Sequence, residues 1–406
     1  MKKLSIRECD VRGKRVLTRL DFNVPLDSDG NITDETRISE ALPTLKDILG
    51  RGGKLILMSH LGRPRGQRDE SLSLAPVAYR LGELLDYPLR FAQDCIGQDA
   101  KRKVAALKSG EMVLLENLRF HPEEEANDPG FSRELAALGD IYVNDAFGTA
   151  HRAHASTVGV TEFFDIRAAG FLMEKELAAL AGALDNPVRP FIAVLGGAKI
   201  KGKINLIKNL LHKVDVLLVG GGMMYTFFKA SGLEIGRSIV DDSYLNMCKE
   251  ILDSIRESGA RLLLPVDAIV AEQLDDAAPR REVSSADIPE DWLGADIGPK
   301  TAELFRTEIA KAKTVFWNGP MGVFEKPSFA DGTKAVAQAI ADVTGRGAVS
   351  IVGGGDSVAA IQLMGIGDQF THISTGGGAS LELMEGKILP GVKALCDAAG
   401  ASCCDV

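Results

Sequence analysis

The chain has 406 residues, of which 45% are hydrophobic and 25% are charged, as in ordinary globular proteins. This length exceeds what one hydrophobic core usually supports, so we expect two domains. A formal net charge of -9 argues against a nucleic-acid partner, because binding a phosphate backbone needs a basic face. The N-terminal segment lacks the apolar core of a secretory signal, which predicts a cytoplasmic protein with no membrane role.

Short apolar and β-branched segments alternate with segments of helical period in the first half of the chain, which is typical of βαβ units with a parallel sheet. The strands predicted there span residues 16–24, 55–60, 112–117 and 141–145. A helix is predicted after the first strand, because Ile38, Leu42, Leu45 and Leu49 would share one face.

The predicted domain boundary is a strong helix-forming segment from Phe171 to Asp185, which Pro187 and Pro190 follow. We expect an N-terminal domain over residues 1–170, a joining helix over residues 171–186 and a C-terminal domain over residues 187–388.

The same strand and helix pattern returns in the second half of the chain. Its predicted strands span residues 191–196, 214–219, 261–266, 314–318, 348–352 and 372–374. One of its helices carries Cys248, Ile251, Leu252 and Ile255 on one face. The expected fold is therefore α/β, with two doubly wound, Rossmann-like parallel-sheet domains, a joining helix, and a cleft and hinge between the domains.

Ligands of doubly wound sheets bind beyond the carboxyl ends of the strands, and in the first half polar and basic residues follow these ends. They are Asp21, Asn23, Arg37, His60, Arg63, Arg119 and Arg152. The arginine fork suits phosphate and carboxylate, so the group predicts a pocket for a small acid that carries both. For any single arginine the alternative is a surface ion pair, and for the histidines His60, His151 and His154 it is a hydrogen-bonded loop position.

Glycine-rich turns follow the strands of the second half, at Gly196, Gly220, Asn318, Gly353 and Thr375. Glycine lets backbone N–H groups approach a polyphosphate, and a helix N-terminus favours negative charge. Lys199 and Lys203 add positive charge, and they would share a helix face if the helix has begun there. Asp356 is placed to hold a magnesium ion bound to phosphates. For one such turn alone, the alternative is a tight connection without a ligand.

Two nucleotide-binding motifs fit poorly. The segment from Gly197 to Ile204 resembles a Walker A loop but has Ile204 where Ser or Thr must bind magnesium. No strand end carries G-x-G-x-x-G with a later acidic residue, so a dinucleotide dehydrogenase has weak support.

The six cysteines show no metal-ligand spacing, and we expect free thiols.

Six motifs occur in order along the chain: RLDFNVP, SHLGRP, NDAFGTAHRAHAS, GGAK, WNGPMGVFE and GGGDS. With these motifs the sequence resembles the phosphoglycerate kinase family over most of its length. The resemblance implies a monomer that transfers a phosphoryl group from 1,3-bisphosphoglycerate to ADP, giving 3-phosphoglycerate and ATP, with magnesium on the nucleotide. It also implies that residues 389–406 pack back on the first domain.

The resemblance also implies roles for particular residues. The acid would bind to the residues at the strand ends of the first half, from Asp21 to Arg152. Glu325 would contact the ribose and Asp356 the magnesium ion. The residues implied to surround the nucleotide are Gly197, Lys199, Lys203, Gly221, Gly222, Asn318, Glu325, Gly354, Gly355, Asp356, Ser357 and Val358.

The acceptor oxygen of such a reaction is an ionised carboxylate, so no general base is needed and catalysis reduces to alignment and charge stabilisation. Arg37 and Lys199, from opposite domains, are the expected catalytic residues, and the cleft must close to unite them. Two other functions stay open at this point. One is a binding protein that closes on a small anion without chemistry, and the other is an inactive relative that serves as an interaction protein.

Overall fold

The computed structural model describes residues 2–398, with the side chains of residues 256 and 257 left out. The chain divides into two compact units. Unit 1 comprises Met1–Ala178 and Ile388–Val406, and unit 2 comprises Ala179–Lys387. The division falls inside helix α6 (Phe171–Asp185), which begins at the predicted residue and ends one residue before the predicted end at residue 186.

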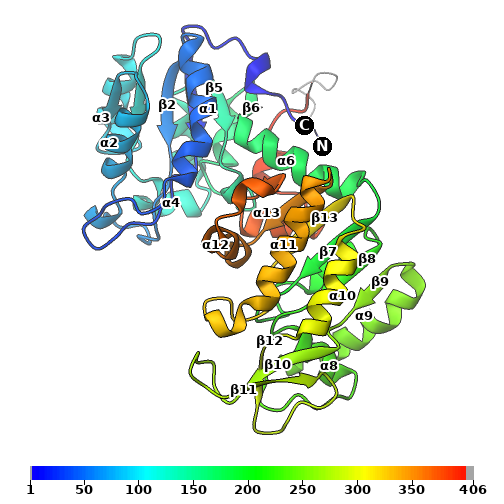
Figure 1. Ribbon diagram of the computed structural model, residues 1–406. Coiled ribbons are helices and arrows are strands. Elements are labelled where there is room, and N and C mark those ends of the chain that lie inside the picture. Colours follow the sequence, from blue (N-terminus) through cyan, green and yellow to red (C-terminus); the bar gives the residue numbers. More distant parts are fainter. Residues whose placement is uncertain (1, 399–406) are drawn as a thin grey trace. The chain divides into compact units, whose positions relative to one another are not determined.

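Unit 1 is built on a six-stranded sheet in the order β3-β4-β2-β1-β5-β6, and all neighbouring strands are parallel. Helix α1 crosses over this sheet, as Figure 1 shows. The strands are β1 (Arg15–Arg19), β2 (Lys54–Met58), β3 (Leu89–Phe91), β4 (Met112–Leu114), β5 (Ile141–Asn144) and β6 (Arg167–Ala169).

The first strand is shorter than predicted, since it ends at Arg19 rather than Val24. Phe22 and Val24 are buried like strand residues. However, the N–H of Phe22 donates to Oγ of Ser59 at 2.8 Å instead of to a neighbouring strand. The alternation of apolar residues therefore led to a wrong strand prediction for a segment that is a buried loop. The three-residue strands β3 and β6 were missed because such short segments carry no readable period.

Each helix of unit 1 has buried residues, and α1 and α2 pack next to strands β2 and β3. In α1 the predicted face is confirmed for Ile38, Leu45 and Leu49, which are buried, while Leu42 is half-buried. The helices are α1 (Thr36–Gly50), α2 (Ala75–Leu84), α3 (Gly97–Ala105), α4 (Pro122–Glu125), α5 (Pro129–Ala136) and α14 (Pro390–Lys393).

Unit 2 contains a second six-stranded parallel sheet in the order β15-β14-β13-β7-β8-β9. All six strands had been predicted, although β9 is shorter than expected. The strands are β7 (Phe191–Leu195), β8 (Val216–Val219), β9 (Arg261–Leu263), β13 (Thr314–Asn318), β14 (Val349–Gly353) and β15 (His372–Ile373). The predicted α/β class with two doubly wound parallel sheets is confirmed.

A small antiparallel sheet in unit 2 was not predicted. Its order is β11-β10-β12, with β10 (Asp267–Ala271) between β11 (Arg280–Ser284) and β12 (Leu293–Ile297). Strand β11 is mostly exposed and reads Arg-Arg-Glu-Val-Ser, so it lacks the apolar alternation of a half-buried strand. The pairing of β10 with β12 also shifts register between Ile269 and Val270.

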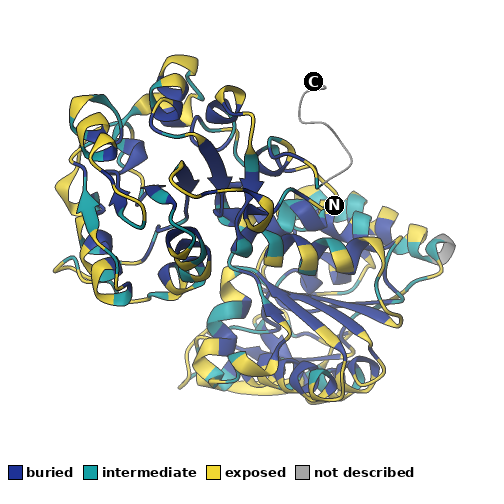
Figure 2. Ribbon diagram, turned by 90° about the horizontal axis from the view of Figure 1, so that it is seen from above, coloured by how far each residue is buried: buried dark blue, intermediate teal, exposed yellow. Residues whose placement is uncertain are grey.

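The helices of unit 2 surround its parallel sheet. In Figure 2 the strands of this sheet are buried, while helices turn exposed faces outward. Helix α9 buries Cys248 and Ile251 of its predicted face and ends at Ser258, before Gly259, which is left-handed at φ 76°. The helices are α7 (Ile204–Leu210), α8 (Met224–Ala230), α9 (Leu245–Ser258), α10 (Pro299–Ile309), α11 (Asp331–Gly345), α12 (Gly355–Met364) and α13 (Gly378–Met384).

The described part of the C-terminal segment lies in unit 1. The N–H of Gly391 donates to the carbonyl of Ala150 at 2.8 Å, and the N–H of Cys396 donates to that of Arg167 at 2.9 Å. Residues 399–406, which belong to the predicted packing segment, lie outside the described residues.

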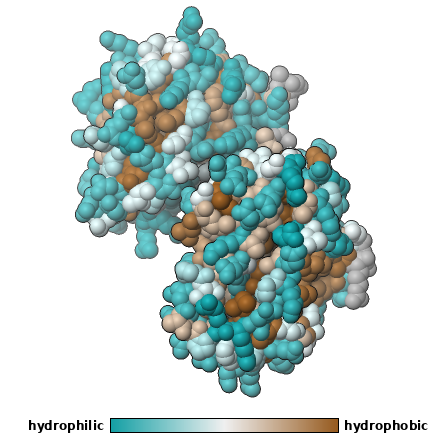
Figure 3. Space-filling view, in the orientation of Figure 1, coloured by the Kyte–Doolittle hydropathy of each residue, from teal (hydrophilic) through white to brown (hydrophobic). Residues whose placement is uncertain are grey.

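Three buried cysteines are free thiols as expected, namely Cys9, Cys95 and Cys248. Cys396 is disulfide-bonded, so the expectation of a free thiol was wrong there. Within residues 2–398, no helix combines the length and apolarity that a membrane span requires. On the face drawn in Figure 3, hydrophilic residues separate the apolar groups.

Candidate active site

Each parallel sheet has one switch point, where the chain turns from building one side of the sheet to building the other. In unit 1 it lies between β1 and β5, and in unit 2 between β7 and β13. A crevice opens outside the carboxyl ends of the strands at such a point, and it is the usual ligand site of this architecture. The predicted site residues of each half lie on segments that follow strands of the parallel sheets, at the switch point and beside it.

In unit 1, Asp21 and Arg37 meet just beyond β1. The guanidinium of Arg37, at the start of α1, donates to Oδ2 of Asp21 at 2.7 Å. His60, which follows β2, places Nδ1 3.9 Å from Oδ1 of the same carboxylate. The Arg37 side chain keeps 34% of its surface exposed, so it is anchored at one end and still open to solvent.

His60 is the centre of a cluster of positive charge. Its ring is buried, and burial together with Arg19, Arg119, Arg37 and Arg152 holds its pKa well below the ordinary range. The imidazole is therefore neutral at physiological pH. Four guanidinium groups around one neutral ring create a locally positive site in an acidic chain, which suits an anion.

Arg119, which follows β4, has N–H donors that make no hydrogen bond with a described residue. Its NH1 donates to the carbonyl of Gly62 at 2.8 Å. Its Nε lies 3.2 Å from Oε1 of Glu125 without hydrogen-bond alignment, and its buried NH2 has no hydrogen-bond partner among the described residues. Burial, followed by the opposing effects of Glu125 and the neighbouring arginines, lowers the pKa of Arg119 to about 10. A bound anion would satisfy these donors.

The loops at this edge are held by amide side chains. Oδ1 of Asn23 accepts the N–H of Gly62 at 2.8 Å, which ties the loop after β1 to the loop after β2. Asn117 similarly donates to the carbonyl of Leu61 at 2.7 Å. Arg63 lies on the same loop, is exposed, and makes no ion pair with a described residue.

Arg19 is a site residue that the sequence analysis missed. It lies at the end of β1 and is 1% exposed; Nε donates to Oγ of Ser156 at 2.8 Å, and NH2 lies 3.2 Å from Nδ1 of His60. Ser156 in turn donates to the buried carboxylate of Glu124 at 2.6 Å. A charged residue inside an apolar strand was the available signal, because such a residue is buried only when it has partners.

The last basic residue, Arg152, is half-buried after β5, with Nε 3.3 Å from Nε2 of His151. Next to it, burial and the guanidinium groups of Arg119, Arg19 and Arg152 lower the pKa of His154 to about 4. Of the predicted anion-binding residues, the structure thus groups Asp21, Arg37, His60, Arg119 and Arg152, and leaves Arg63 on the exposed loop beside them.

In unit 2, Lys203 occupies the crevice at the switch point. Its ammonium group donates to the carbonyl of Gly196, at the end of β7, and to that of Asn318, at the end of β13, at 3.1 Å. Burial lowers the pKa of Lys203 to about 8, while Asp356 acts in the opposite direction. Helix α7 begins only at Ile204, so Lys199 and Lys203 do not share a helix face. Lys199 is exposed on the preceding turn.

The glycine turns of unit 2 are shaped for close backbone approach. Gly354 has φ 92°, and a Cβ there would lie 2.6 Å from Nδ2 of Asn318. A Cβ on Gly221, also left-handed, would overlap the backbone of Gly197. Asn318 donates to the carbonyl of Gly353 at 2.7 Å, and Ser357 accepts the N–H of Gly319 at 2.5 Å. The predicted residues Asn318 and Ser357 therefore fix the turns.

A cavity of about 390 Å³ opens beside these turns within unit 2. Its polar mouth includes the predicted residues Gly197, Gly221, Gly222, Glu325 and Asp356. Glu325 and Asp356 are exposed, and Asp356 lies in the first turn of α12 and makes no hydrogen bond with a described residue. Gly355 starts α12, and half-buried Val358 lies in its first turns.

The apolar wall of this cavity was not predicted. It contains Met224, Tyr225, Ile239, Leu274, Leu293, Met321 and Val323. Leu293 belongs to the unpredicted strand β12, which explains why the wall was missed. Ile239 and Leu274 are 43% and 45% exposed, and their positions in the sequence gave no sign that they line a cavity. The cavity therefore combines an apolar wall with polar and glycine residues.

The fold and these two edges define a class: a two-unit α/β protein with an arginine cluster at the strand ends of one unit and a glycine-lined cavity at the strand ends of the other. The family model described as "Phosphoglycerate kinase" matches residues 6–387. Curated proteins named phosphoglycerate kinase from Pelodictyon phaeoclathratiforme and Chlorobium luteolum are each 58% identical to the chain, over 98% and 97% of it and 100% of their own length.

Two solved structures agree with these matches. Phosphoglycerate kinase from Coxiella burnetii is 41% identical with a TM-score of 0.88, and that from Pyrococcus horikoshii is 36% identical with a TM-score of 0.82. Each match covers 97% of this chain and 98% of the other. The chain belongs to the phosphoglycerate kinase family. It is a glycolytic kinase that acts on phosphoglycerate and ATP or ADP and transfers phosphate at a carboxyl group, as the sequence predicted.

Proposed function

We propose that unit 1 binds 3-phosphoglycerate or its acyl phosphate at the arginine cluster, and that unit 2 binds the nucleotide at the glycine turns. The observation that carries the first assignment is the buried NH2 of Arg119, which has no hydrogen-bond partner among the described residues and lies among other guanidinium groups. Asp21, Asn23, Arg37, His60, Arg63 and Arg152 complete the acid site.

The cavity of unit 2 supports the assignment of the nucleotide site. Its apolar wall would hold the base, Glu325 the ribose, and the turns at Gly197, Gly221, Gly222, Gly354 and Gly355 the phosphates. Lys203, Asn318, Ser357 and Val358 hold these turns in place or lie beside them.

Asp356 is the proposed contact of the nucleotide's Mg²⁺. Its carboxylate fits such an ion because it is exposed at the mouth of the cavity, makes no hydrogen bond with a described residue, and offers the oxygen ligands that magnesium prefers. When bound, the ion supplies positive charge to the phosphates. The chain belongs to a nucleotide-dependent family, and a magnesium ion on that nucleotide would contact Asp356.

The proposed reaction requires the protein mainly to align the two substrates and to stabilise charge. The carboxylate of the acid is already ionised, so no residue has to remove a proton. Arg37 at the start of α1 and Lys199 on the exposed turn before α7 are open to solvent and can reach the phosphoryl group, where they stabilise the charge that develops on it. The neutral ring of His60 leaves the positive charge of the cluster to the arginines.

Because each unit binds one substrate, transfer requires the two substrates to be brought together. We propose that α6 and the turn at residues 375–378 provide the hinge, and that closure needs both ligands. Small-angle scattering tests this step. The radius of gyration should fall most with 3-phosphoglycerate and magnesium nucleotide together, and an unchanged value under those conditions would refute closure. We also propose that the enzyme is cytoplasmic and monomeric. Light scattering of the purified chain can check the monomeric state.

Calorimetry tests the division between the units. Arg119→Gln should weaken binding of 3-phosphoglycerate by about tenfold or more and leave ADP binding unchanged, since a charge-assisted hydrogen bond contributes about 1.5–3 kcal/mol. Arg90→Gln is the matched control. Arg90 also lies in unit 1, in an ion pair with Glu111 at 3.0 Å, but on the edge strand β3. Equal losses in both variants would contradict the assignment.

A further inference from the structure

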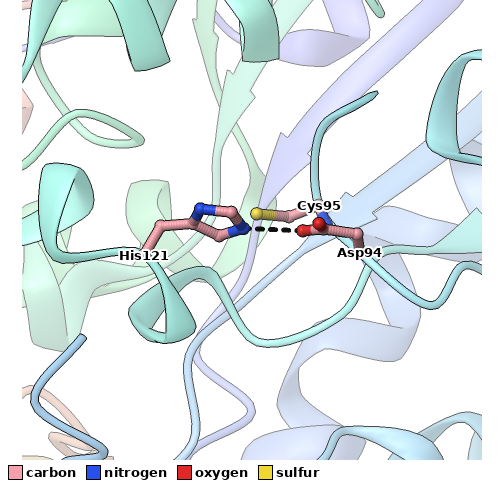
Figure 4. Close-up of side chains that lie close together, drawn as sticks. All are labelled: Asp94, Cys95 and His121. Atoms are coloured by element: carbon pink, nitrogen blue, oxygen red, sulfur yellow. Dashed lines mark hydrogen bonds and ion pairs between the residues drawn. The ribbon is translucent and has the colours of Figure 1, made fainter. Parts of the chain in front are cut away.

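Three potential metal ligands meet in unit 1, outside the residues placed in the active site. They are Asp94, Cys95 and His121, drawn in Figure 4. Asp94 and Cys95 lie between β3 and α3, and His121 lies between the 3-10 helix Leu118–Phe120 and α4. One carboxylate oxygen, the sulfur and one imidazole nitrogen all lie within 4.8 Å of one another. Because Asp94 and His121 are 27 positions apart, cysteine spacing gave no sign of the cluster.

The side chains are already oriented toward one another. Nε2 of His121 lies 2.7 Å from Oδ1 of Asp94, and that oxygen also accepts the N–H of Cys95 at 2.7 Å. The His121 ring packs against Phe131, with ring centroids 5.2 Å apart. In a tetrahedral zinc site, ligand atoms at metal distances of about 2.0–2.3 Å lie roughly 3.3–3.5 Å from one another. Small side-chain rotations therefore convert the cluster into three ligands of one ion.

The burial of the three residues is graded. Cys95 is 0% exposed, whereas the side chains of His121 and Asp94 are 26% and 48% exposed. An ion could enter past Asp94 and His121 and find the sulfur at the bottom of the site. The open side leaves room for water as a fourth ligand.

The charge of the cluster suits a divalent cation. A thiolate and a carboxylate together carry two negative charges, and imidazole is a neutral ligand. The neighbouring carboxylates of Glu123 and Glu124 act on His121 and Cys95 with the same negative sign.

We propose that Asp94, Cys95 and His121 bind one zinc ion. Sulfur, imidazole nitrogen and carboxylate oxygen form a ligand set typical of Zn²⁺, while Mg²⁺ prefers six oxygen ligands. The site is thus distinct in chemistry from the magnesium of the nucleotide. The ion links the turn at residues 94–95 to the segment that begins at Leu118 and carries Arg119, so it stabilises the support of the acid site.

Cobalt titration of the full chain, stripped of metal with a chelator and kept reduced, tests the site. Co²⁺ substitutes for Zn²⁺ and gives a sulfur-to-metal charge-transfer band only when a thiolate binds it. We expect one equivalent of Co²⁺ to produce this band, one equivalent of Zn²⁺ to abolish it, and Mg²⁺ to have no effect.

Variants assign the ligands. Cys95→Ser should abolish the band, and Asp94→Asn and His121→Gln should each weaken Zn²⁺ binding by about 100-fold or more, because even outer-shell partners contribute 10–100-fold. Cys248→Ser is the matched control, since Cys248 is also a buried free thiol but lies in unit 2. Asp94 is the most exposed of the three, so Asp94→Asn reports on the site even if Cys95→Ser folds poorly.

Zinc should also raise the melting temperature of the wild-type chain and of Cys248→Ser, but not that of Asp94→Asn. A band that persists in Cys95→Ser, or unchanged Zn²⁺ affinity in both Asp94→Asn and His121→Gln, would overturn the proposal.

Discussion

The proposed ligand-binding edges of the two units consist of different chemical groups. In unit 1 the edge consists of charged side chains, with Arg19, Arg37, Arg119 and Arg152 around the buried ring of His60. In unit 2 it consists of backbone, because left-handed glycines such as Gly354 expose main-chain groups next to an apolar cavity. In our proposal, the same architecture therefore serves a small acid that carries a phosphate and a carboxylate by adding positive side chains, and a large nucleotide by removing side chains.

This contrast predicts that unit 1 is sensitive to loss of charge, and that Arg37→Ala has the largest effect. If Arg37 stabilises charge that develops during transfer, its loss should lower kcat by about 100-fold or more, roughly 3 kcal/mol, with a smaller change in either KM. Steady-state kinetics in both directions measures this effect.

Arg15→Ala is the control for that measurement, because Arg15 starts β1 and forms an ion pair with Asp140 at 2.6 Å away from the carboxyl end of the strand. Its kcat should stay near wild type. If Arg37→Ala raised only the KM for 3-phosphoglycerate, Arg37 would be a binding residue rather than a catalytic one.

Unit 2 should instead be sensitive to added bulk. Gly354→Ala introduces a Cβ that meets Nδ2 of Asn318 at 2.6 Å, and it strains a backbone at φ 92°. We expect ADP affinity to fall by about tenfold or more, since the turn must shift away from the position that the phosphates require, at a strain of about 1–3 kcal/mol.

Gly347→Ala separates strain from collision in this experiment. Gly347 has the same φ of 92° but no atom within 4 Å of the added Cβ. It should lower the melting temperature without changing ADP affinity. Equal affinities for Gly354→Ala and the wild type in calorimetry would show that the glycine turn does not approach the nucleotide.

The predictability of the molecule follows the same contrast. Buried parallel strands such as β13 were predicted correctly, because a continuous apolar segment identifies such a strand without knowledge of its neighbours. The rule that ligands bind beyond the strand ends then predicted the side chains that we propose for the acid site. The wall of the cavity depends on β12, which pairs antiparallel with a strand whose register shifts, and such pairing leaves little trace in the local sequence. Arg19 stood out only as a charged residue in an apolar segment, because its partners His60 and Ser156 are distant in sequence. The contact of His121 with Asp94 is likewise one that a single sequence does not reveal.

A smaller effect is expected from Asp356→Asn, which removes one charge and keeps the shape of the side chain. Binding of magnesium-ADP should weaken by about tenfold, whereas 3-phosphoglycerate binding should not change, because Asp356 lies on the glycine-rich edge. Asp331→Asn is the control, since Asp331 occupies the equivalent first turn of α11 in the same unit. Calorimetry that shows equal losses for both substrates would contradict the division of labour.

The smallest expected effect concerns a buried carboxylate at the cavity of unit 2. Burial raises the pKa of Asp296 to about 7, although its oxygens accept the N–H groups of Gly332 and Ile297. In an unfolded chain this group titrates near pH 4, so between about pH 4 and pH 7 the folded state binds more protons than the unfolded state. The contribution of Asp296 to stability is therefore present at low pH and is lost as the pH rises through 7.

Tryptophan fluorescence can isolate this contribution, because both tryptophans, Trp292 and Trp317, belong to unit 2. The urea midpoint of the wild type, followed by this signal, should decline more between about pH 5 and pH 8 than that of Asp296→Asn, whose amide does not titrate. The variant should also be less stable at pH 5, because an amide oxygen replaces only one of the two acceptors that Gly332 and Ile297 use. Parallel pH profiles for the two proteins would show that Asp296 titrates near its ordinary pKa, and that this wall of the nucleotide cavity is more polar than its burial indicates.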